Sequence, residues 1–227
     1  MKKQWCITKI TAIFIAIMER LLWLYNEPYN EDYPVLCFDE RPCFLIGDKV
    51  APIHCKVGQV AKEDYHYEKL GSCSLLMAIE PLSGKRYAKV YPTRKALDYA
   101  DFLDFLAKEY PNAKAIRLVQ DNLNTHDKSS FYKAFSPEKA FSLSQFYEFF
   151  FTPKHASWLN MAEIEFSAIS KQCLNRRIPT MEEISKEVEL IVKERNRDKV
   201  KIKWQFTINK ARDTFSKYYD KLNVNKT

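Results

Sequence analysis

Apolar residues follow two patterns along this chain: helical spacing in some segments and short continuous runs in others. Near the start, helical spacing is kept by Ile10, Ile13, Ile17, Leu21 and Leu24. We therefore expect an amphipathic helix that packs on a partner surface. The segment is too short and too interrupted by charge to be a membrane span or a signal peptide.

Short apolar runs bounded by Pro, Gly or acidic residues predict the strands. One strand covers Val35–Phe38 and ends at Asp39. Further strands are expected within 71–81, 85–92, 113–121 and 146–153, the first two of them joined as a hairpin by a turn at Pro81–Gly84. Helices are expected within 93–112, 129–135, 157–177 and 179–197, the last opened by a capping box from Thr180 to Glu183. Strands that come first as a meander and later alternate with helices predict a mixed α/β sheet.

Two of these strands end on a carboxylate. Asp39 follows "VLCF" and Asp121 follows "IRLVQ". If the two strands are neighbours, the carboxylates lie side by side and repel unless cations compensate them. Oxygen ligands suit Mg²⁺ or Mn²⁺, and two such ions serve in-line phosphoryl transfer. A turn residue is the alternative for each Asp, and Glu40 competes with Asp39 as Asp127 does with Asp121.

A third ligand is available on the segment 157–177. On one continuous helix, Glu163 falls beside Leu159 and Phe166 at the edge of the apolar stripe, while Glu165 points towards solvent or Trp158. A carboxylate beside a core face is expensive unless something pairs it. Glu163 is therefore the preferred candidate.

Composition narrows the class of protein. The chain has 227 residues, a net charge of +7 and only 4 glycines, and no glycine-rich phosphate loop is present. The positive charge favours an anionic partner such as nucleic acid. The six cysteines form no CxxC pair, which predicts reduced thiols in a cytoplasmic protein rather than disulfides or a zinc site.

Three blocks in this order carry a resemblance: "VLCFDERP", "LVQDNLNTH" and "FTPKHASWLNMAEIEFS". The sequence resembles bacterial DDE transposases of the insertion sequence six-thirty family, the bacterial branch of the Tc/mariner superfamily. The likeness extends from about residue 4 to about residue 219, through "CLNRRIPT" and "KWQFT". It implies an RNase H-like (retroviral integrase-like) fold in which the strands ending at Asp39 and Asp121 are adjacent.

The resemblance also implies the chemistry. Its catalytic and metal-binding triad falls on Asp39 in "CFDE", Asp121 in "QDN" and Glu163 in "LNMAE". Two Mg²⁺ or Mn²⁺ ions would then support hydrolysis of a DNA phosphodiester and strand transfer. Accessory positions that flank the triad are Asn122, His126, Lys154 and His155. For the two histidines a purely structural hydrogen bond is an equal alternative.

Basic residues near the end of the chain are candidates for binding DNA phosphates, with a strong dependence on salt. They are Arg176, Arg177, Lys193, Arg195, Arg197, Lys199, Lys201 and Lys203. A solvated charged face is the plainer alternative.

One departure from the family concerns DNA reading. We expect residues 1–30 to form one helix and a linker, which is too little for the helix-turn-helix modules of full-length relatives. Residues 31–227 would form the catalytic domain, with a core to about 178 and a basic helical extension from about 179. Two hypotheses remain: a transposase catalytic domain, dimeric when active, that works with an upstream helix-turn-helix product on DNA in the bacterial cytosol, or a non-catalytic remnant or regulator that binds DNA or transposase subunits.

Overall fold

A single mixed sheet organises the chain. The computed structural model describes residues 10–53, 55–122 and 127–223. The strands are β1 (Val35–Asp48), β2 (Tyr67–Glu80), β3 (Lys85–Tyr91), β4 (Ile116–Gln120) and β5 (Tyr147–Phe151), in the spatial order β3-β2-β1-β4-β5. β1 pairs antiparallel with β2 and parallel with β4, so the predicted mixed sheet is confirmed.

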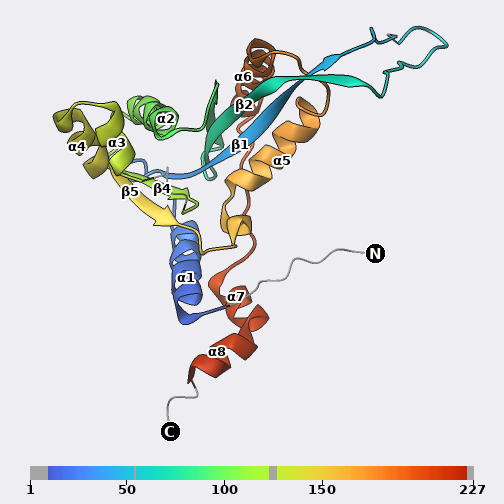
Figure 1. The fold of residues 1–227 in the computed structure, drawn as a ribbon. Coiled ribbons are helices and arrows are strands. Elements are labelled where there is room, and N and C mark those ends of the chain that lie inside the picture. Colours follow the sequence, from blue (N-terminus) through green and yellow to red (C-terminus); the bar gives the residue numbers. More distant parts are fainter. Residues whose placement is uncertain (1–9, 54, 123–126, 224–227) are drawn as a thin grey trace.

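Helices lie on both faces of the sheet (Figure 1). They are α1 (Ala12–Asn26), α2 (Ala96–Glu109), α3 (Ser129–Ala134), α4 (Pro137–Phe146), α5 (Ala162–Gln172), α6 (Met181–Arg197), α7 (Ile208–Thr214) and α8 (Ser216–Asn223), with a short 3₁₀ helix at Ser157–Leu159. Successive side chains of β1 point to opposite faces of the sheet, so the strand contributes residues to the core on both sides. Leu36 and Phe38 pack with α2, α3 and α4, whereas Cys37 faces α1 and α7. Further along the same face, α5 and α6 cover Cys43 of β1 together with Leu75 and Met77 of β2.

β1 is longer than the sequence pattern predicted. The strand was expected to end at Asp39, but it runs through Asp39 to Asp48. Its parallel pairing with β4 covers only Val35 to Cys37, and from there on it pairs with β2 alone. The two strands continue as a ribbon that projects from the body, towards the upper right in Figure 1. In this part of β1 only Cys43 and Gly47 are buried, so the segment lacks the continuous apolar run that revealed the strand before Asp39.

The amino-terminal helix forms as expected, and Leu21 and Leu24 of the predicted stripe are buried, but the rest of the buried face differs. Thr11 caps it by accepting a hydrogen bond from the backbone N–H of Phe14. Phe14, Ile15 and Met18 are buried, whereas Ile13 of the predicted stripe is 72% exposed. No helix in the described ranges is long and apolar enough to cross a membrane.

The described cysteines are free thiols, and Cys6 lies outside the described residues. Cys37 is buried, and burial raises its pKa to about 12. Cys43 and Cys73 stand opposite each other on β1 and β2, and burial raises the pKa of both.

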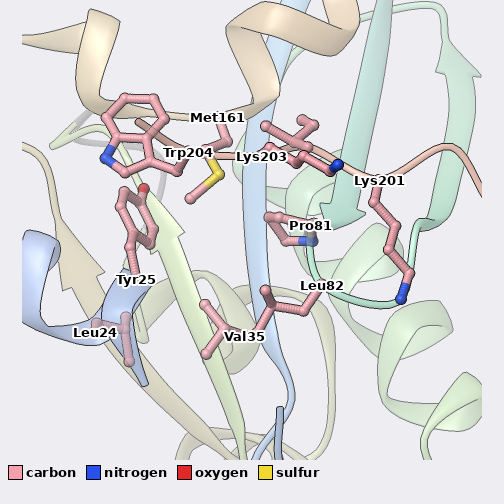
Figure 2. Close-up of a pocket in the computed structure, with 10 residues that line it drawn as sticks. Leu24, Tyr25, Val35, Pro81, Leu82, Met161, Lys201, Lys203 and Trp204 are labelled. Carbon is pink, nitrogen blue, oxygen red and sulfur yellow. The ribbon is translucent and has the colours of Figure 1, made fainter. Parts of the chain in front are cut away.

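After α6 and a turn at residues 198–199, an extended segment, residues 200–207, crosses the β2–β3 turn and leads to α7. The predicted hairpin turn is present, and its Gly84 has a φ of +80° and donates to the carbonyl of Glu80. Within the segment, Ile202 donates to the carbonyl of Pro81, and Trp204 packs edge-on against Tyr25 of α1. An apolar pocket of about 350 Å³ lies between this segment, α1 and the turn (Figure 2). None of the candidate carboxylates lines it.

Candidate active site

The first two acidic positions lie just beyond the paired stretch of two neighbouring strands, inside β1 for Asp39 and directly after β4 for Asp121. β1 and β4 are parallel, with Cys37 level with Val119. Asp39 and Asp121 each lie two residues beyond this last pair. Neighbouring parallel strands direct their carboxyl ends to one edge of a sheet, where α/β proteins gather ligands. The pattern of residues alone could not predict that these two strands are neighbours; the resemblance implied it, and the structure confirms it.

Buried hydrogen bonds hold the backbone just before Asp121. Gln120 is fully buried, and its side-chain oxygen accepts a hydrogen bond of 2.6 Å from the hydroxyl of Tyr99. Burial raises the pKa of Tyr99, so its phenol keeps the proton that it donates. The carbonyl of Gln120 also accepts from the backbone N–H of Thr152, just after β5, at 2.9 Å. The end of β4 is therefore fixed from the helix layer and from the neighbouring strand.

Asn160 joins the third acidic position to the first. Its side-chain N–H donates to the carbonyl of Phe38, directly before Asp39, at 2.7 Å. Its side-chain oxygen accepts from the backbone N–H of Ala162, the first residue of α5. Glu163 follows in the first turn and donates its own N–H to the backbone carbonyl of Asn160. One buried side chain thus fastens the start of α5 to the strand beside Asp39.

The predicted orientations of Glu163 and Glu165 are wrong. Glu163 is exposed, and among the described residues its carboxylate has neither a hydrogen bond nor an ion pair. Glu165 is fully buried. The cause is a break at Asn160–Met161, where the 3₁₀ helix ends and α5 begins, so that Leu159 does not share the phase of α5. The buried positions of α5 are Ala162, Glu165, Phe166 and Ile169.

Two arginines pair with Glu165, and neither pairing was foreseen. Arg86 of β3 and Arg195 of α6 both contact its carboxylate, at 2.8 and 2.5 Å. Burial lowers the pKa of Arg86 although Glu165 opposes that shift, while the hydrogen bond to Glu165 raises the pKa of Arg195. Glu165 is a paired interior carboxylate and not a candidate metal ligand.

The two competing acids have contacts of their own. Glu40 forms an ion pair with Arg94 at 3.5 Å. Asp127 accepts hydrogen bonds from the hydroxyl and the backbone N–H of Ser129, which lower its pKa. Asp127 therefore serves the start of α3 as a local turn residue does.

Metal binding is compatible with the donor chemistry at this edge. Asp39 and Asp121 are half-buried, and the carboxylate of Asp39 accepts from the backbone N–H of Glu40 at 2.8 Å. Across the ranges that the structure describes, no three His, Cys, Asp or Glu side chains are grouped closely enough to hold an ion as they stand. The three candidates offer only carboxylate oxygens, the donors that Mg²⁺ and Mn²⁺ take. The donor set thus fits a hard divalent ion.

The accessory positions flank this edge. Asn122, Lys154 and His155 are exposed, and His155 has a φ of 63°, in the left-handed region. His126 lies outside the described residues.

The predicted DNA-binding residues fall into two groups. The four arginines pair within the chain: Arg176 with Glu187, Arg177 with Asp48, Arg195 with Glu165 and Arg197 with Asp198. The four lysines are all exposed. Lys201 and Lys203 alternate along the extended segment with half-buried Ile202 and Trp204, whereas Lys199 precedes the segment in a turn and has a φ of 47°. Alternation in an extended chain turns the side chains of Lys201 and Lys203 to one side, so these two lysines are the better placed for an anion.

Three supporting residues escaped the sequence reasoning. Asn160 lies in the "LNMAE" motif three residues before Glu163, and Gln120 lies in the "QDN" motif directly before Asp121. The position of Arg86 could have been noticed in the sequence, because it shares the strand face of Ala88 and Val90, which pack against α6. A charged residue at an inward strand position predicts a buried partner.

Comparison with known proteins gives one family and one fold. The family described as DDE superfamily endonuclease matches residues 34–185, more than half of the chain. A comparison with curated protein sequences finds no match.

Among solved structures, the Mos1 mariner paired end complex with Mn superposes with a TM-score of 0.57 at 16% identity, over 88% of this chain and 62% of that chain. The Mos1 transposase paired-end complex with left transposon end gives 0.59 at 14% identity, over 88% and 62%. The Mos1 Strand Transfer Complex gives 0.58 at 15%, over 88% and 61%. The chain thus spans about three fifths of the length of these relatives, whose likeness confirms the predicted RNase H-like fold. Together with the family match over the segment that carries all three carboxylates, the fold leads to one conclusion: this chain belongs to the DDE superfamily endonucleases.

Proposed function

We propose that this chain is the catalytic domain of a DNA transposase, with Asp39, Asp121 and Glu163 as its metal-binding carboxylates. The observation that carries the proposal is the convergence of backbone around the sheet edge. Asp39 and Asp121 each follow the last β1–β4 pair by two residues, and Asn160 fastens the first turn of α5 beside Asp39. The family match and the Mos1 paired-end and strand-transfer structures support the same reading.

In this proposal each part of the chain has a separate task. Asp39, Asp121 and Glu163 would hold Mg²⁺ or Mn²⁺, and relatives were solved with Mn and with Mg. The bound ions would supply Lewis-acid stabilisation of the charge that develops on the phosphate during hydrolysis and strand transfer. Asn122, Lys154 and His155 would orient the scissile phosphate, and the lysines of residues 199–203 would neutralise neighbouring phosphates.

The finer assignments belong to the same proposal. They are membership of the insertion sequence six-thirty family, the division at residue 30 and about residue 178, action as a homodimer on transposon ends, and a helix-turn-helix partner that reads those ends. Two of the relatives are described as paired end complexes, which supports two copies acting together.

The test is cutting of DNA by the full chain with Mn²⁺ or Mg²⁺. Substrates are a duplex that carries the element's terminal repeat and a supercoiled plasmid, which needs no sequence reading. We expect nicking by the wild type, no nicking by Asp121→Asn, and salt-sensitive DNA binding by both. Asp127→Asn is the matched control and should still nick, because Asp127 serves α3.

Two outcomes contradict the proposal. Equal nicking by wild type and Asp121→Asn would reject the triad. Salt-sensitive binding without nicking by any form, on either substrate and with either ion, would instead support the non-catalytic regulator.

A further inference from the structure

An ion cluster is buried behind α5, on the side away from Glu163. The Nε of Arg86 lies 2.8 Å from Oε1 of Glu165, and both side chains are 0% exposed. Arg195 adds two hydrogen bonds to the same carboxylate, from Nε at 2.5 Å and from Nη2 at 2.9 Å. Two cations therefore share one interior carboxylate, and the Arg195 contact is of the bidentate kind that fixes orientation as well as distance.

The cluster is tied into three further segments of backbone. Asn196 of α6 accepts from the backbone N–H of Arg86 and donates to its carbonyl, both at 2.8 Å. The guanidinium of Arg86 donates to the carbonyl of Gly84 at 2.9 Å and to that of Val200 at 2.6 Å. Arg86 thus links β3 and its turn, α5, α6 and the extended segment.

Such a cluster contributes little net stability compared with well-packed apolar side chains, because removing the charges from water costs about as much as their attraction returns. The cluster instead fixes the position of α5 relative to α6. Apolar contacts tolerate sliding and rotation, whereas a bidentate pair between helices α5 and α6 permits neither.

Glu165 and Glu163 lie two residues apart in the first turn of α5. About 100° per residue separates side chains on a helix, so a carboxylate locked inward at 165 sets the direction of residue 163. Asn160 fixes where the helix begins, and Glu165 fixes how far it is rotated about its axis.

We infer that Glu165 is a positioning residue: through Arg86 and Arg195 it sets the angle at which α5 presents Glu163 to a divalent ion shared with Asp39 and Asp121. The inference rests on the proposed function and adds a determinant of metal affinity that never touches the metal.

The test is direct binding of Mn²⁺ by the full chain, followed from the loss of the paramagnetic resonance signal of free Mn²⁺. We expect Glu165→Gln to weaken Mn²⁺ binding by about 10- to 100-fold, the range for residues that orient metal ligands. Its DNA binding should keep the wild-type salt dependence, because the bond from Arg86 to Val200 does not involve Glu165.

A matched control distinguishes the loss of the orientation of Glu163 from a general loss of fold stability. Leu106→Ala truncates a fully buried side chain of α2, in the layer on the opposite face of the sheet. It should lower the unfolding midpoint and leave Mn²⁺ affinity unchanged. Equal weakening of Mn²⁺ binding by Leu106→Ala and Glu165→Gln would overturn the inference, as would wild-type affinity in Glu165→Gln.

Two further variants complete the design. If Glu165→Gln does not fold, Arg195→Lys decides, because it keeps the charge and loses the two-point contact; we expect a smaller weakening of Mn²⁺ binding, and unchanged affinity would overturn the inference. Asp121→Asn tests the site itself. If Asp121→Asn binds Mn²⁺ as the wild type does, the proposed function fails; if it does not and Glu165→Gln does, only the positioning role fails.

Discussion

The edge of the sheet and the interior behind α5 both hold acidic side chains, under opposite conditions. At the edge, Glu163 is exposed and its carboxylate forms no hydrogen bond or ion pair within the described ranges, whereas Glu165 is enclosed and bound by two arginines. The same residue type, two positions apart on one helix, is thus available for binding at one place and committed to structure at the other. The difference teaches that burial with full pairing marks a structural carboxylate, and exposure beside converging strand ends marks a candidate ligand.

The sharpest way to test this contrast is to neutralise the exposed member. Glu163→Gln should reduce DNA cutting by roughly 10²- to 10³-fold or more, the scale of losing one electrostatic group from an active site. Its free energy of unfolding should stay within about 0.5 kcal/mol of wild type, as for other surface changes. The measurements are plasmid nicking with Mn²⁺ and urea denaturation.

Glu182→Gln is the matched control, because Glu182 is an exposed glutamate in the first turn of another helix, α6. It should cut as the wild type does. A Glu163→Gln protein that cuts normally would remove Glu163 from the triad.

Removing a partner of the buried Glu165 should instead lower the free energy of unfolding. Arg86→Met removes one cation from a pair that is 0% exposed on both sides. Removing one partner of a buried ion pair costs about 3–5 kcal/mol, because the remaining charge loses its compensation. Urea denaturation measures the loss.

Arg176→Met is the control for that experiment. Arg176 pairs with Glu187 at 2.7 Å, with side chains 49% and 35% exposed. An exposed pair contributes at most about 1 kcal/mol. Similar losses for the two variants would show that burial does not distinguish these pairs.

The link between the two regions should have an intermediate effect. Asn160→Ala leaves the carbonyl of Phe38 without the side-chain donor and removes the acceptor for the N–H of Ala162. We expect a loss of about 1–3 kcal/mol for the buried groups left unsatisfied, together with weaker Mn²⁺ binding. Asn160→Asp keeps an acceptor for the N–H of Ala162 but replaces the donor to Phe38 by a buried carboxylate oxygen, so it should destabilise the fold as well. Wild-type Mn²⁺ affinity in both variants would exclude Asn160 from arranging the edge.

Much of the architecture could be predicted from the sequence, because the hairpin, its turn and the capped α6 depend on local signals. Thr180 accepts from the N–H of Glu183 as its motif predicts. α4 was missed although Ser136 caps it and Pro137 opens it, since its buried residues, Ala140, Leu143 and Ser144, show only a weak apolar stripe.

The site was only partly predictable, for physical reasons. The pattern of residues placed carboxylates at strand ends but could not show which strands are neighbours, because pairing is decided by the whole sheet. The orientation of Glu165 depended on a one-turn break at Asn160–Met161 that spacing does not reveal. The bonds of Arg86 to Val200 and to Asn196 join residues more than 100 positions apart, which no local pattern contains.

The smallest expected effect concerns pH, at a pair outside both regions. The hydrogen bond from Arg212 lowers the pKa of Glu19 below its ordinary 4.5 and joins α7 to α1. A depressed carboxyl pKa stabilises the fold above the unfolded-state pKa, and that stabilisation is lost as pH falls through the folded-state pKa. We expect less than about 1 kcal/mol from this largely exposed pair.

Urea denaturation of wild type and Glu19→Gln between neutral pH and about pH 3 measures this contribution. The two curves should differ at neutral pH and converge in acid. Curves that stay parallel throughout would mean that Glu19 does not contribute to the acid sensitivity of the fold.

The contact of Gly84 with the backbone of the extended segment bears on which changes this chain could tolerate. A Cβ at position 84 would lie 2.9 Å from the backbone of Lys199, and the φ of +80° is one that side chains rarely adopt. Hairpin turns are ordinarily permissive places for sequence drift and for inserted residues. In a saturation library selected for folded protein, position 84 should therefore be among the most restricted of the chain, while Leu82, 39% exposed in the same turn, should accept most replacements.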